Sequence, residues 1–79
     1  MQGMNIVVIA LYRITNSLDM TYALALKLYS NKRLTRVFHD ESAQSLYDMC
    51  NKLKVFIQAY LPRLGQAMHR ADVETDYFA

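Results

Sequence analysis

Three side chains in this 79-residue sequence could act as a nucleophile, as a base near neutral pH or as a soft metal ligand: Cys50, His39 and His69. Cys50 falls on the apolar stripe of a predicted helix, where burial raises the pKa of a thiol and makes it unreactive. His39 precedes Asp40 and Glu41, but no HxxxH, CxxC or paired-acid spacing elsewhere completes a metal site. The two glycines form no phosphate-binding loop. We therefore expect no catalytic residue, no metal site and no cofactor, and hence not an enzyme.

The length and composition predict one small domain over residues 1–79, in which 72–79 form an acidic and mobile tail. With 53% hydrophobic residues, the chain carries more apolar surface than a small monomer needs to bury. The single cysteine excludes an internal disulfide and favours a reducing, cytoplasmic setting. The apolar run Ile6 to Leu11 is too short for a spanning helix and lacks the preceding positive charge of a signal peptide, so we expect no membrane partner.

The segment at about 5–14 is predicted to be a strand, because β-branched residues dominate it. Its two faces are both apolar, so both should be covered. A strand that lies at the edge of a sheet and is this apolar would pair with a second copy. This predicts a dimer interface formed by Ile6, Val7, Val8, Ile9 and Leu11.

The segment at about 20–30 has two interpretations. Asp19 could cap a helix that closes near Asn31, which would give a β-α-β-α or a mostly α fold. Alternatively, Leu24, Leu26 and Leu28 alternate with smaller or polar residues as in a strand, with a tight turn at residues 30–32. We favour the strand, because a helix here would be apolar nearly all round. Together with the strand at about 5–14 and a third strand at about 33–39, this strand predicts a three-stranded antiparallel β-meander.

A long amphipathic helix at about 41–61 is the best-defined element. Asp40 is its expected N-cap, and Pro62 should end or kink it. Its apolar positions recur at spacings of three and four residues and should face the sheet: Leu46, Cys50, Leu53, Ile57, Tyr60 and Leu64. A short C-terminal helix should run from 63 to about 71. The predicted fold class is therefore α+β.

Charge is distributed unevenly along the chain. A stretch without acids contains a candidate partner-binding surface: Lys27, Tyr29, Lys32, Arg33 and Arg36. Mixed cations and aromatic rings are typical of protein hot spots and of nucleic-acid surfaces. The net charge of +2 favours nucleic acid only weakly.

These features together predict a non-catalytic protein-protein interaction module, expected to be a homodimer that acts as a regulator, adaptor or inhibitor. Small modules of this size and element order include inhibitors encoded by phages and mobile elements, such as anti-CRISPR proteins. The alternative is a small nucleic-acid-binding regulator that uses the basic hairpin. The partner is expected to be another protein, whose identity the sequence does not indicate.

Overall fold

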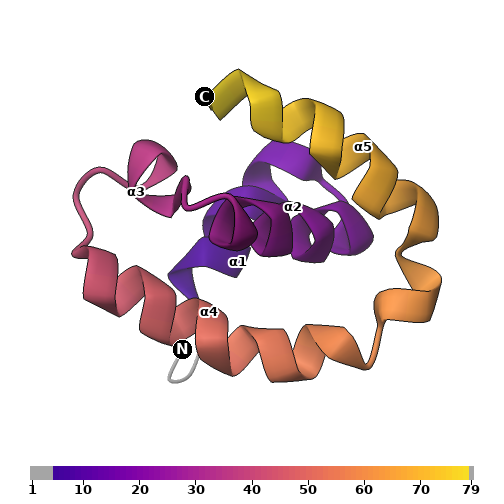
Figure 1. The fold of residues 1–79 in the computed structure, drawn as a ribbon, viewed down its shortest axis with the longest axis horizontal. Helices are drawn as coiled ribbons and strands as arrows, with labels where there is room; N and C mark the ends of the chain where they lie inside the picture. Colours follow the sequence, from indigo (N-terminus) through magenta and orange to yellow (C-terminus); the bar gives the residue numbers. More distant parts are fainter. Residues whose placement is uncertain (1–4, 79) are drawn as a thin grey trace.

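The computed structural model describes residues 5–78, and this part of the chain contains helices and no β-strand (Figure 1). The elements in chain order are α1 (Ile6–Thr15), α2 (Leu18–Ser30), α3 (Leu34–Val37), α4 (Ala43–Gln58), the 3₁₀ helix η1 (Leu61–Arg63), α5 (Gly65–Thr75) and the 3₁₀ helix η2 (Asp76–Phe78).

The predicted α+β fold with a three-stranded meander is wrong. The segments expected as strands at 5–14, 20–30 and 33–39 form α1, α2 and the short α3. The mostly α alternative describes the observed architecture. The acidic residues expected in a tail lie in α5 and, up to residue 78, in η2, while Ala79 lies outside the described residues.

Helix α2 lies at the centre of the fold, with α1, α4 and α5 arranged around it (Figure 1). Ser17 caps it by accepting a hydrogen bond from the Met20 amide, and Asp19 places negative charge in its first turn. All residues from 20 to 25 are buried. A helix that is apolar all round is stable when neighbours cover every side, and this explains why the alternating leucines do not form a strand.

The end of α2 is a Schellman motif. The Arg33 amide donates to the Leu28 carbonyl at 2.9 Å, and the Lys32 amide donates to the Tyr29 carbonyl at 3.2 Å. Lys32 takes the left-handed conformation with φ 57°, whereas Asn31 has φ −91°. The hairpin turn expected at residues 30–32 is therefore a helix C-terminus.

The connection between α1 and α2 is tight and hydrogen-bonded. Asn16 ends α1 in the left-handed conformation, with φ 55°, and its amide donates to the Tyr12 carbonyl. The buried Thr21 hydroxyl donates to the Ser17 carbonyl at 2.7 Å and lies 2.9 Å from the Thr15 hydroxyl. This network fixes the orientation of α1 against α2.

Helix α4 occupies most of the range predicted for a helix at 41–61, but it starts and ends inside that range. Ser42, not the expected Asp40, caps α4 by accepting a hydrogen bond from the Ser45 amide. Pro62 lies in η1, after the end of the helix. Leu46, Cys50 and Ile57 are buried as the apolar stripe predicts, although the stripe faces α2 and α3 and not a sheet.

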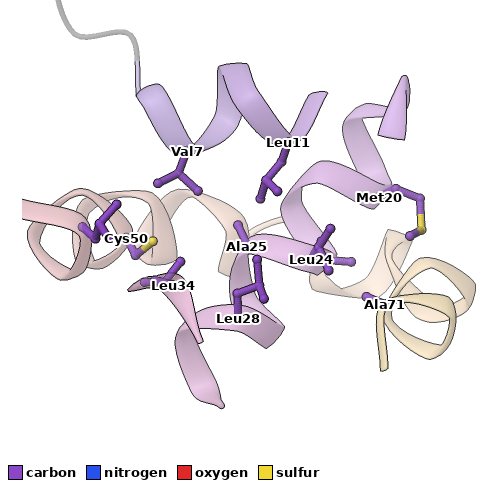
Figure 2. Packing of buried hydrophobic residues seen from close by; sticks show 11 residues of the cluster. Val7, Leu11, Met20, Leu24, Ala25, Leu28, Leu34, Cys50 and Ala71 are labelled. Atoms are coloured by element: carbon purple, nitrogen blue, oxygen red, sulfur yellow. The ribbon is translucent and has the colours of Figure 1, made fainter. Parts of the chain in front are cut away.

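The main core lies between α2 and its neighbours. Figure 2 shows Val7 and Leu11 pointing from α1 toward Ala25 and Leu28 of α2, with Leu34 close by. The β-branched residues of α1 therefore lie in a helix and not in a strand. Burial of Val7 and Leu11 stabilises this arrangement by more than the small loss in intrinsic helix propensity costs.

Candidate protein-binding surfaces

The residues with nucleophilic or basic side chains do not form a reactive cluster. Cys50 is buried, and desolvation raises the pKa of its thiol from 9.0 to about 11. His39 and His69 are both exposed and lie on different parts of the chain. Within residues 5–78, no group of three or more histidine, cysteine or acidic side chains could hold a metal ion. The burial of Cys50 agrees with its predicted place on the apolar stripe.

Two of the cations expected on a partner-binding surface are paired within the chain. Lys27 Nζ lies 2.6 Å from an Asp72 carboxylate oxygen. The Arg33 guanidinium donates to the Thr75 carbonyl at 3.1 Å and lies 3.9 Å from a carboxylate oxygen of Asp76. The basic and acidic segments of the sequence therefore neutralise each other in part, which weakens the case for a phosphate-binding surface.

Tyr29 also makes internal contacts. Its hydroxyl donates to the Asn51 side chain at 2.6 Å, its ring lies 5.4 Å from that of Tyr47, and the Lys54 ammonium lies 5.7 Å from its ring centroid. This tyrosine joins α2 to α4 and is not a free stacking platform.

Lys32 and Arg36, the remaining two candidates, are exposed and form no ion pair with residues 5–78. Lys32 follows α2, and Arg36 lies in the last turn of α3. Of the five candidates, Lys32 and Arg36 are therefore the two that are exposed and free of ion pairs within the described residues.

The residues predicted to form a dimer interface divide between the core and the surface. Val7 and Leu11 have no exposed area, so a second copy cannot reach them. Ile6 is 40% exposed, and Val8 and Ile9 are partly buried. Because this segment is a helix, its residues reach a partner through one side of α1 and not through a strand edge.

The outer side of α1 and the start of α2 form an apolar groove with a volume of about 320 Å³. Tyr12 is 45% exposed and Leu18 is 48% exposed, and both line this hollow. We call this the α1–α2 groove, and its lining is Val8, Ile9, Tyr12, Arg13 and Leu18.

An aromatic cluster lies beside the groove. The ring of Tyr22 is 5.9 Å from that of Phe56 and 5.6 Å from that of Tyr60. Val8 packs against the buried group that contains Tyr22, so it connects the groove to the cluster. Burial raises the pKa of Tyr22, and the neighbouring Tyr60 raises it further. Phe56, which lies on α4, is 51% exposed, so this cluster also presents apolar area to solvent.

Arg13, Leu18 and this cluster were not among the residues predicted from the sequence. The signal is present as pairs four residues apart, Leu18 with Tyr22 and Phe56 with Tyr60. Such residues are neighbours on one face of a helix, whereas in a strand they share a face but lie about 13 Å apart. Assigning a strand to 20–30 concealed the first pair.

No helix within residues 5–78 is long and apolar enough to cross a membrane. Searches of curated proteins and of solved structures gave no match to this chain. The model of the Rab-GTPase-TBC domain family matches residues 1–79. This match spans the whole sequence, and the chain belongs to the Rab-GTPase-TBC domain family.

Proposed function

We propose that this chain is a non-catalytic module that binds a Rab GTPase. Domains of its family act by stimulating GTP hydrolysis by Rab GTPases, so the hydrolytic chemistry belongs to the partner. A regulator, adaptor or inhibitor that works by binding is consistent with this role, and the lone buried cysteine supports a cytoplasmic setting.

The observation that carries the proposal is the exposed apolar surface of the α1–α2 groove and the aromatic cluster. Exposed Tyr12, Leu18 and Phe56 lie on or beside a hollow, and large apolar side chains gathered in this way are typical of protein interfaces. Two arginines border this surface: Arg13 lines the groove, and the Arg63 guanidinium lies 6.0 Å from the Tyr60 ring centroid. Tyrosine and arginine are enriched among the residues that dominate binding energy.

A direct binding experiment tests the proposal. The chain is immobilised, and a panel of recombinant Rab GTPases is passed over it, each loaded with GDP or with a non-hydrolysable GTP analogue. We expect at least one Rab GTPase to bind, and Tyr12→Asp to abolish binding, because it places a charge in the apolar groove. The matched control is Val55→Asp, since Val55 is 74% exposed on α4 and does not line the groove.

The same proteins allow hydrolysis to be measured under single-turnover conditions. A faster release of phosphate would assign the stimulating activity of the family to this chain, whereas binding without acceleration would define it as an adaptor or inhibitor. If no Rab GTPase binds more tightly than an unrelated small GTPase, the proposal is wrong.

A further inference from the structure

We propose that the α1–α2 groove receives an apolar side chain of the partner that is flanked by a carboxylate, and that Arg13 pairs with this carboxylate. The inference rests on the proposed function and adds the chemistry that the partner must present.

The groove is apolar apart from one charged side chain. Arg13 is the only residue of its lining that is charged at neutral pH, and the rest of the lining is Val8, Ile9, Tyr12 and Leu18. Arg13 is exposed and makes no ion pair with residues 5–78. A guanidinium beside an apolar hollow is complemented best by a carboxylate next to an apolar anchor, because a carboxylate can accept two parallel hydrogen bonds from it.

The charge of α1 is of one sign. Arg13 is the only charged side chain of this helix, which contains no acidic residue. Asp19, the nearest acid in sequence, lines a different hollow together with Arg63 and Arg70. If a second copy docked through its own α1, the two Arg13 side chains would come together, and neither α1 could supply an acidic residue to pair with them. An acidic partner avoids this cost.

The groove is held in place before binding. Val7 and Leu11 anchor the inner side of α1 in the core, and the hydrogen bonds among Thr15, Ser17 and Thr21 fix the turn into α2. A partner therefore loses little binding energy to ordering this surface, which is the advantage of a preorganised site.

The experiment uses the Rab GTPase panel with the full chain and the variants Arg13→Gln and Arg13→Glu. The matched control is Arg70→Glu, which reverses an exposed arginine of α5 that does not line the groove. Circular dichroism and urea unfolding check that each variant keeps its fold. We expect Arg13→Glu to weaken binding by about tenfold or more and Arg70→Glu to have little effect.

Two further measurements separate charge pairing from packing. Binding of the unaltered chain should weaken with added salt more steeply than binding of Arg13→Gln, because salt screens the pair. Replacing acidic surface residues of the bound Rab GTPase by lysine, one at a time, should identify a variant that binds Arg13→Glu better than it binds the unaltered chain.

The outcomes distinguish this inference from the proposed function. Binding that is unchanged in Arg13→Glu overturns the pairing and leaves the proposed function in place. Absence of binding by every Rab GTPase overturns both. Light scattering that shows a dimer of the unaltered chain, and a monomer of Tyr12→Asp, would identify a second copy as the occupant and overturn the partner chemistry.

Discussion

Lys27 Nζ lies 2.6 Å from a carboxylate oxygen of Asp72, which links the C-terminal half of α2 to α5. The Lys27 side chain is 23% exposed and that of Asp72 is 56% exposed, so water screens the pair in part. We expect a coupling free energy of about 0.5 kcal/mol from a double-mutant cycle with Lys27→Met and Asp72→Asn.

Urea unfolding of the four proteins measures this coupling, which should vanish near about 1 M salt. The same cycle at Arg33 and Asp76 is the control, because that pair is 3.9 Å apart and the Asp76 side chain is 83% exposed. A larger coupling at Arg33 and Asp76 would contradict the account.

The Thr21 hydroxyl should contribute to stability through its bond to the Ser17 carbonyl. Thr21→Val keeps the shape of the side chain but removes the hydroxyl's contacts with the Ser17 carbonyl and the Thr15 hydroxyl. The carbonyl still accepts from the Thr21 amide, and the Thr15 hydroxyl still donates to it. We therefore expect the free energy of unfolding to fall by about 1 kcal/mol, the net value of a hydrogen bond. Thr35→Val, at an exposed position of α3, should change it by less than about 0.5 kcal/mol. Equal effects at the two threonines would show that the hydroxyl network is unimportant.

Lys32 adopts the left-handed conformation that favours glycine, with φ 57°. Lys32→Gly relieves about 1–2 kcal/mol of steric cost in the folded state. The greater freedom of glycine in the unfolded chain costs about 0.4–1 kcal/mol of stability, so we expect a net gain of up to about 1.6 kcal/mol. Asn31→Gly should be destabilising, because Asn31 has φ −91° and no strain to relieve. Thermal unfolding of both variants checks the difference in sign.

Stability should depend on pH through Cys50. Burial raises the pKa of this thiol from 9.0 to about 11, so the folded protein holds the proton more tightly than the unfolded chain does. The contribution is fully present below pH 9 and is lost as the pH rises toward 11, which amounts to about 2 kcal/mol. Urea unfolding at pH 8, 9, 10 and about 11 should show a steeper loss in the unaltered chain than in Cys50→Ala. Parallel pH profiles would refute the assignment.

The apolar stripe of α4 could be predicted from the sequence, because one face of this helix is polar and the other is not. Its first residue could not be predicted equally well, since Asp40 and Ser42 are both good capping residues. The same periodicity argument failed for α2. A helix that is covered on every side has no polar face, so Leu24, Leu26 and Leu28 gave a pattern that matches a strand as well as a helix.

The candidate surface was partly predictable. The composition of the chain predicts an excess of apolar surface and an interacting segment at Ile6 to Leu11. Which side chains of that segment reach the surface depends on how the helix α1 is oriented against the core. Pairing of Lys27 and Arg33 with acids more than forty residues away depends on how α5 folds back onto α2. Local sequence does not contain that information.

The central position of α2 has a consequence for the dynamics of the chain. Helices α1, α4 and α5 all pack on it, so no part of its buried stretch from 20 to 25 can open without displacing a neighbour. Backbone amides in the interior of α2 should therefore exchange with deuterium only when the whole molecule unfolds, and their exchange free energy should equal the global stability. Amides at the exposed ends of α1 and α5 should exchange through smaller openings. Protection against exchange should therefore be highest in α2 and decrease toward the helices around it.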